Sequence, residues 1–185
     1  MKIDGFSYAV QQKPALHLLH QYLRLKLVPF GKSKSINFGD DGFECQHGPA
    51  ECMGNMVQDC SLHHLKAQSD KKKLAYVACE MEIEAGAKGQ FDCIEKAKLS
   101  SEVIEKCVTL GEGTVLQLES EYYTSLVSPK FVPTVTVNGV FDQEIQDYAQ
   151  EDLIGTLCSI LTVTPPCARY YNYLALQNLM NTNAN

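Results

Sequence analysis

The stretch that decides the fold is Cys-Gln-His-Gly-Pro-Ala-Glu-Cys-Met-Gly-Asn-Met-Val-Gln-Asp-Cys, residues 45–60, which holds three of the eight cysteines. Zinc is one explanation for such a cluster, because six candidate ligands lie close together in the chain: Cys45, His47, Cys52, Cys60, His63 and His64. The spacing lacks the closely paired cysteines of a zinc knuckle. We therefore favour structural disulfides over metal, and we expect no cofactor.

Composition narrows the class of protein. The chain has 185 residues, of which 45% are hydrophobic and 21% charged, as in a soluble globular domain. A net charge of −6 argues against nucleic acid as a partner, and the run Lys71–Lys73 is typical of a solvated helix face. No apolar stretch approaches the roughly 20 residues that span a bilayer. The even number of cysteines indicates an oxidising compartment, although the first residues have no apolar region typical of a signal peptide; a processed mature form would reconcile the two.

Hydrophobic periodicity predicts helices in the middle of the chain and strands towards its ends. We expect a short strand at 2–10, a helix near 15–22, a strand at 23–30 and a surface loop at 31–44. Residues 50–128 have mostly helical patterns, with Ser100 or Ser101 as a helix N-cap. A hairpin with an Asn138–Gly139 turn follows, then a helix near 149–161 and a polar tail after Tyr173 that is expected to fray. This order predicts a split α/β domain with a helical insertion.

The stretch 45–60 resembles the signature of the gamma-interferon-inducible lysosomal thiol reductase (GILT) family, CQHGx2ECx2Nx4C. Every fixed position of that signature matches: Cys45, Gln46, His47, Gly48, Glu51, Cys52, Asn55 and Cys60. Residues 27–31 and 132–139 are also similar to family members, so the resemblance covers about residues 14–167. It implies a single thioredoxin-like α/β domain with a shortened N-terminal strand and helix. Its halves would lie at about 1–44 and 129–165, the helical insertion at about 45–128 and the polar tail at about 173–185. The resemblance also implies a cis peptide bond before Pro133.

The same resemblance implies a redox-active Cys-x-x-Cys between the first strand and the first helix, because a reductase needs an exposed thiolate and a resolving thiol. The corresponding stretch, residues 6–13, contains Ser7 but no cysteine, and no Cys-x-x-Cys occurs elsewhere in the sequence. Two explanations stay open: a deletion between about residues 6 and 14, or an N-terminal segment missing from this form. We expect no catalytic residue in the present sequence.

The eight cysteines are instead expected to form four structural disulfides: Cys45, Cys52, Cys60, Cys79, Cys93, Cys107, Cys158 and Cys167. Cys158–Cys167 would tie the last helix to the Pro165–Pro166 turn, and Cys79–Cys93 would close a helix–loop connection. Cys45, Cys52, Cys60 and Cys107 would share the other two bridges. His47 is expected to be a hydrogen-bonded structural residue.

The sequence thus predicts a non-catalytic GILT-like protein, secreted or lysosomal, that binds a protein or cell-surface partner. The alternatives are a thiol–disulfide oxidoreductase that uses an unusual cysteine or a missing segment, a small metal-binding module, and a regulator that competes with active relatives for substrates. A homodimer is also compatible with the shortened first strand, because an unpaired sheet edge has to be covered.

Overall fold

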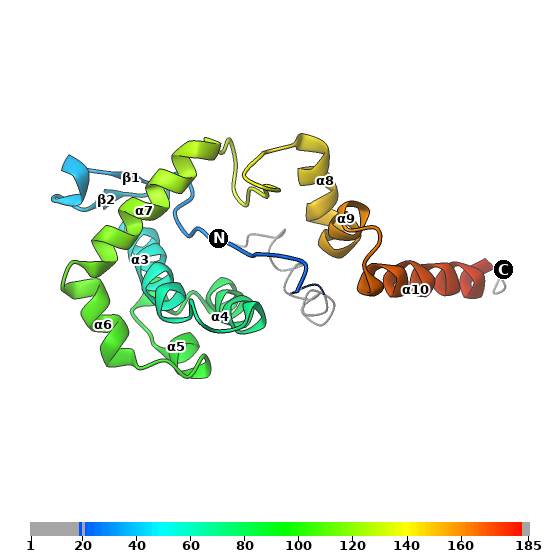
Figure 1. Ribbon diagram of the computed structural model, residues 1–185. Coiled ribbons are helices and arrows are strands. Elements are labelled where there is room, and N and C mark those ends of the chain that lie inside the picture. The colour runs from blue at the N-terminus through cyan, green and yellow to red at the C-terminus, as the bar shows by residue number, and fades with distance from the viewer. Residues whose placement is uncertain (1–18, 20, 183–185) are drawn as a thin grey trace.

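The computed structural model describes residue 19 and residues 21–182, and it is mostly helical (Figure 1). The helices are α3 (Pro49–His64), α4 (Asp70–Ile83), α5 (Asp92–Lys96), α6 (Ser101–Thr109), α7 (Glu112–Val127), α8 (Gln143–Glu151), α9 (Leu153–Ile160) and α10 (Pro165–Thr182), with short 3₁₀ turns η1 (Asn37–Gly39) and η2 (Gly86–Lys88). The helical prediction for 50–128 is confirmed, and the Ser100 hydroxyl caps α6 by accepting from the Val103 amide. No helix in the described part is long and apolar enough to cross a membrane.

The surface loop expected at 31–44 holds a short two-stranded hairpin that the sequence pattern did not predict. Strand β1 (Lys34–Ser35) pairs antiparallel with β2 (Phe43–Glu44), with Ser35 opposite Phe43. Left-handed backbone at Gly39 and Gly42, which glycine adopts without a Cβ clash, lets the chain reverse between the strands. The Ser35 amide donates to the Glu121 carboxylate on α7, which fastens the hairpin to the helices.

The segment 23–30 does not form the expected strand. Its side chains do alternate between partly buried and exposed up to Pro29, as predicted, but within the described chain no neighbouring strand pairs with it. Leu23 packs against the C-terminal hydrophobic cluster, and Leu27 packs against the larger cluster of α3–α6. The alternation therefore reflects an extended connector between two cores, because periodicity alone cannot supply a hydrogen-bonded partner.

The larger core lies between α3, α4, α5 and α6. Cys60, Leu65, Tyr76, Ile94 and Ile104 are almost fully buried in it. Two disulfides cross it: Cys60–Cys107 joins α3 to α6, and Cys79–Cys93 joins α4 to α5.

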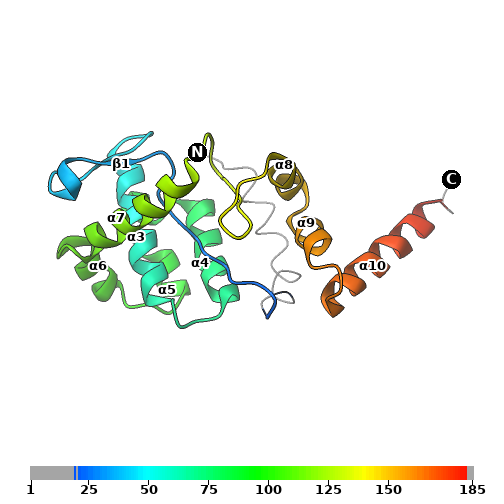
Figure 2. The same ribbon diagram turned by 45° about the horizontal axis from the view of Figure 1, so that its top comes forward.

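The smaller core is built by α9 and α10 together with Leu19, with Leu74 of α4 packed against it. The single helix expected at 149–161 is two helices, because Asp152 leaves the helical conformation and its carboxylate caps α9 by accepting from the Gly155 amide. Cys158–Cys167 links α9 to α10, as expected. The tail does not fray after Tyr173: α10 continues to Thr182 and projects from the body (Figures 1 and 2).

Between α7 and α8 the predicted hairpin is reduced to its turn. Asn138 and Gly139 both have positive φ, as a type I′ turn requires, and Val137 pairs with Val140 in one isolated bridge. The Val132–Pro133 peptide bond is cis. The strand expected at 2–10, the cysteine-free stretch 6–13 and most of the helix expected at 15–22 lie outside the described residues.

Candidate functional site

The signature residues form the turn that enters α3. Gly48 is the N-cap with φ of 90°, a left-handed conformation that side chains disfavour, and Pro49 occupies the first helical position. The Glu51 carboxylate reaches back and accepts from both the backbone amide of His47 and its Nδ1, at 2.6 and 2.9 Å. This arrangement resembles a capping box shifted by one residue, since the Gly48 amide is already satisfied by the Cys45 carbonyl. His47 is thus hydrogen-bonded within the turn.

The Cys45–Cys52 disulfide closes this turn. Cys45 directly follows β2, and Cys52 lies in the first turns of α3. Both cysteines are partly exposed, whereas each of the other three disulfides has at least one buried cysteine. Cys45–Cys52 is therefore the most accessible of the four bridges.

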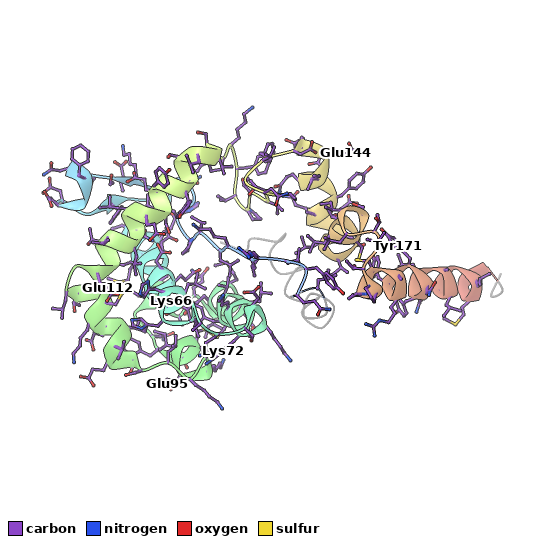
Figure 3. The ribbon with its side chains drawn as sticks, viewed as in Figure 1. Lys66, Lys72, Glu95, Glu112, Glu144 and Tyr171 are labelled. Atoms are coloured by element: carbon purple, nitrogen blue, oxygen red, sulfur yellow. A yellow bond between two sulfur atoms is a disulfide. The ribbon has the colours of Figure 1, made fainter. Side chains whose placement is uncertain are left out.

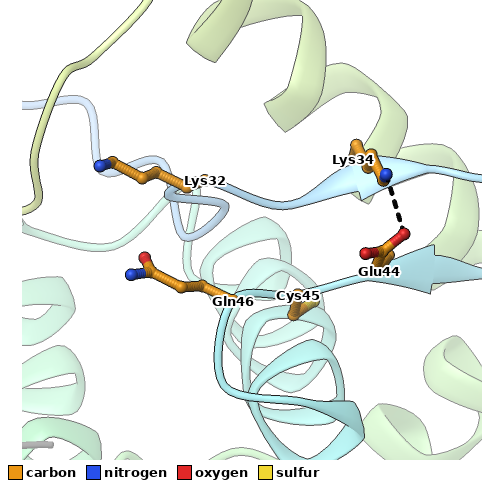
Figure 4. Close-up of a pocket in the computed structure, with 5 residues that line it drawn as sticks. All are labelled: Lys32, Lys34, Glu44, Cys45 and Gln46. Atoms are coloured by element: carbon orange, nitrogen blue, oxygen red, sulfur yellow. Dashed lines mark ion pairs between the residues drawn. The ribbon is translucent and has the colours of Figure 1, made fainter.

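A pocket of about 300 Å³ opens beside Cys45. Lys32, Lys34, Glu44 and Gln46 line the rest of it. Lys34 is paired with Glu44 across the hairpin at 2.9 Å, while Lys32 and Gln46 extend on the other side (Figure 4). Among the described residues Lys32 makes no ion pair. The pocket thus brings together a disulfide-bonded cysteine and a lysine without an ion-pair partner among the described residues.

The rest of the signature anchors α3 to its surroundings. The Asn55 amide donates to the Phe30 carbonyl and to the Ser33 hydroxyl, which holds the segment before β1 against α3. Cys60 is bonded to Cys107 in the core. The Gln46 side chain does not anchor α3; it lines the pocket instead.

The signature residues do not fit a zinc site. Thiolate is the form of cysteine that binds zinc, and all eight cysteines of the sequence are in disulfides. One group of possible ligands within the described residues, His64, Cys107 and Glu112, includes the Cys107 sulfur that is bonded to Cys60. His63 instead faces Glu112 at 3.7 Å.

The run Lys71–Lys73 lies at the start of α4, where Lys73 forms an ion pair with Asp70. Figure 3 labels Lys72 of this run.

Comparison with known proteins identifies the family of this chain. The family model described as "Gamma interferon inducible lysosomal thiol reductase (GILT)" matches residues 7–109, more than half of the chain. The chain belongs to the GILT family. GILT-like protein 1 of Drosophila melanogaster is 32% identical over 80% of this chain and 65% of its own length.

Two further relatives carry the family name. The gamma-interferon-inducible lysosomal thiol reductase-like protein of Anopheles gambiae is 32% identical over 84% of this chain and 70% of its own length. The gamma-interferon-inducible lysosomal thiol reductase of Carassius auratus is 30% identical over 85% of this chain and 63% of its own length. This GILT chain therefore spans about two thirds of the length of the relatives it matches.

A buried polar cluster joins α3 to α7, and the sequence did not predict it. Asp59 of α3 accepts hydrogen bonds from Gln117 and Ser120 of α7, and the Gln117 amide also donates to the Pro29 carbonyl at 3.2 Å. Burial raises the pKa of Asp59 to about 7, against the lowering effect of the two hydrogen bonds. Asp59 directly precedes Cys60 in the signature, but its partners lie about 60 residues away, and the sequence offers no signal that joins them.

A second buried amide holds the segment after Pro133. Gln146 of α8 is fully buried; its Oε1 accepts from the Val135 amide and its Nε2 donates to the Pro133 carbonyl, at 2.7 and 3.2 Å. The Gln146 side chain thus satisfies two backbone groups, the Val135 amide and the Pro133 carbonyl, that a neighbouring strand would pair with in a sheet. The path of the chain beside Pro133 thus depends on α8 in this GILT protein.

Proposed function

We propose that this chain is a non-catalytic GILT-like protein that acts as a secreted or lysosomal binding or modulatory protein, with its thiol reductase activity lost. The observation that carries the proposal is the state of the cysteines: all eight are engaged in four disulfides, and even the closest pair, Cys45 and Cys52, has six residues between its members. Dithiol reductases cycle a pair separated by two residues. The scaffold retains the family signature without that pair.

Four disulfides also support the proposed compartment, because such bonds persist outside the cytosol. Two buried carboxyl groups also support an acidic compartment. Burial raises the pKa of both Asp59 and Glu80, so both are more readily accommodated as neutral acids in an acidic environment. The thioredoxin-like arrangement belongs to this proposal too; it rests on membership of the GILT family.

The alternative is that the whole protein is a thiol–disulfide oxidoreductase. It is favoured by relatives named thiol reductase or thiol reductase-like and by the length of those relatives, of which this chain spans about two thirds. The missing dithiol would then belong to a segment outside this sequence.

The test is reduction of insulin disulfides with a thiol donor, followed by turbidity at pH 5 and pH 7. We expect the chain to leave the rate of the thiol donor alone unchanged, and a clear acceleration would contradict the loss of activity. Capture of a protein partner from extracellular fluid by the folded, disulfide-intact chain, and not by the reduced and alkylated chain, would support the binding role.

A homodimer through α10 is part of the same proposal. Apolar side chains remain exposed along this helix: Tyr171, Tyr173, Leu174, Leu176, Leu179 and Met180. Figure 3 shows side chains along α10, and no other element of the described part of the chain lies beside most of its length. Arg169 is its single charged residue, so two copies can pack with little like-charge repulsion in a chain of net charge −6.

A further inference from the structure

We propose that Cys45–Cys52 is a thiol-exchange site at which a small anionic thiol of the glutathione class attacks Cys45 from the adjoining pocket. The product is a mixed disulfide on Cys45 and a free thiol on Cys52. This site is separate from the dithiol that is absent from the sequence, and the inference does not depend on the binding role proposed above.

Accessibility selects this disulfide among the four. Thiol exchange requires the attacking sulfur to reach a disulfide sulfur. Cys60, Cys107, Cys158 and Cys167 are all buried, and so is Cys93 in the remaining bridge. Cys79 is partly exposed but is bonded to the buried Cys93, whereas both members of Cys45–Cys52 are partly exposed. Cys45–Cys52 is therefore the bridge most accessible to an external thiol.

The pocket selects which sulfur is attacked. Cys45 lines the pocket, and Cys52 is not among its lining residues. Lys32 and Lys34 line the same pocket, and Glu44, which also faces it, is already paired with Lys34. The positive charge of Lys32 is therefore available to a carboxylate of the incoming thiol, and it favours the thiolate form of that nucleophile.

The helix selects the leaving sulfur. Cys52 lies near the N-terminus of the 16-residue helix α3, where the helix macrodipole favours a negative charge. The nearest acid in that turn, Glu51, is occupied by its hydrogen bonds to His47. A better leaving thiolate speeds exchange, so attack at Cys45 with departure of Cys52 is the favoured direction.

The step is balanced. The incoming thiolate forms a bond to the Cys45 sulfur, the Cys45–Cys52 bond breaks, and Cys52 leaves as a thiolate that takes up a proton from water. A second thiol molecule can attack the mixed disulfide, which leaves Cys45 and Cys52 reduced and releases the oxidised small thiol.

The turn survives this exchange because other bonds hold it. The β1–β2 pairing, the bond from the Gly48 amide to the Cys45 carbonyl and the Glu51–His47 contacts do not involve sulfur. The modified protein is thus expected to keep its helical circular dichroism spectrum.

The test uses the whole chain with reduced glutathione at low ionic strength, quenched by iodoacetamide at intervals and mapped by mass spectrometry of non-reduced peptides. We expect the first modified species to carry glutathione on Cys45 and the alkyl group on Cys52, with the other three disulfides intact. Opening of another disulfide first, or glutathione mainly on Cys52, would overturn the assignment.

A charge variant separates the pocket from simple exposure. Lys32→Gln is expected to slow the reaction with glutathione about threefold, because a single charge near a partly enclosed site gives a modest steering effect. It should leave the rate with neutral 2-mercaptoethanol unchanged. The matched control Lys71→Gln removes the same charge from exposed α4 surface and should affect neither rate. Equal effects of the two substitutions, or no effect of Lys32→Gln on glutathione, would contradict the role of the pocket.

Discussion

Gln117 of α7 donates a hydrogen bond to the carboxyl group of Asp59 of α3, and both side chains are buried. The same amide nitrogen donates to the Pro29 carbonyl, so one side chain joins the 16-residue helices α3 and α7 to the segment that precedes β1. Because Asp59 is taken out of water, its protonation is linked to folding.

Stability is expected to fall as the pH rises. The pKa of Asp59 is about 7 in the folded protein and near 3.8 when unfolded, so between these values the folded state holds a proton that the unfolded state has lost. The free energy of unfolding should therefore decrease by about 2 to 3 kcal/mol between pH 5 and pH 7.5. Chemical denaturation at both pH values measures it.

Asp59→Asn should flatten this dependence, because asparagine is neutral and can still bond to Ser120. A smaller slope should remain from Glu80, whose pKa burial also raises. Glu105→Gln, an exposed substitution on α6, serves as the control and should keep the wild-type slope. Equal slopes for wild type and Asp59→Asn would refute the linkage.

The disulfides should differ in their contribution to stability. Replacing Cys60 and Cys107 together by alanine opens a bridge with a sequence separation of 47, and it should lower the free energy of unfolding by about 4 kcal/mol. The Cys45→Ala, Cys52→Ala pair opens a bridge with a separation of 7 and should cost about 2 kcal/mol. Urea titration of both double variants compares them, and the reverse order would be inconsistent with this account.

Gln146 should be required for the order of the segment after Pro133. Gln146→Ala leaves the Val135 amide without its partner, which should destabilise the protein by about 2 kcal/mol. Hydrogen exchange at that amide should also become faster. Gln143→Ala, on the exposed face of the same helix, should change stability by less than about 0.5 kcal/mol. The idea fails if the two variants behave alike.

The α10 helix should set the oligomeric state. At high protein concentration we expect sedimentation velocity to give twice the chain mass of 20.6 kDa. Leu176→Glu places a charge on an exposed apolar position and should shift the protein to the monomer. Gln90→Glu adds the same charge at an exposed position outside α10 and should leave the dimer intact. A wild-type protein that stays monomeric would exclude this dimer.

Local chemistry made some elements predictable. Ser100 caps α6, and Asn138–Gly139 turns the chain, because each depends on residues only a few positions away. The two disulfides Cys79–Cys93 and Cys158–Cys167 could be predicted from the sequence because each closes a short loop.

Other features depend on distant partners. Residues 23–30 have a strand pattern without a strand, because Leu23 and Leu27 pack on different cores. The Asp59–Gln117 hydrogen bond could not be predicted from the sequence, because neither residue type indicates a partner 58 positions away. The break at Asp152 was in principle detectable, because aspartate three residues before Gly155 is a common N-cap.

The turn into α3 changes what a signature match means. Seven of its eight fixed residues form cross-links, hydrogen bonds or a left-handed backbone position in that turn and helix, and the eighth faces the pocket. Folding alone is thus a sufficient reason to retain them. We expect that sequence searches with this motif recover enzymes and chemically silent relatives alike, so membership in the family and possession of its reaction need to be established by separate evidence.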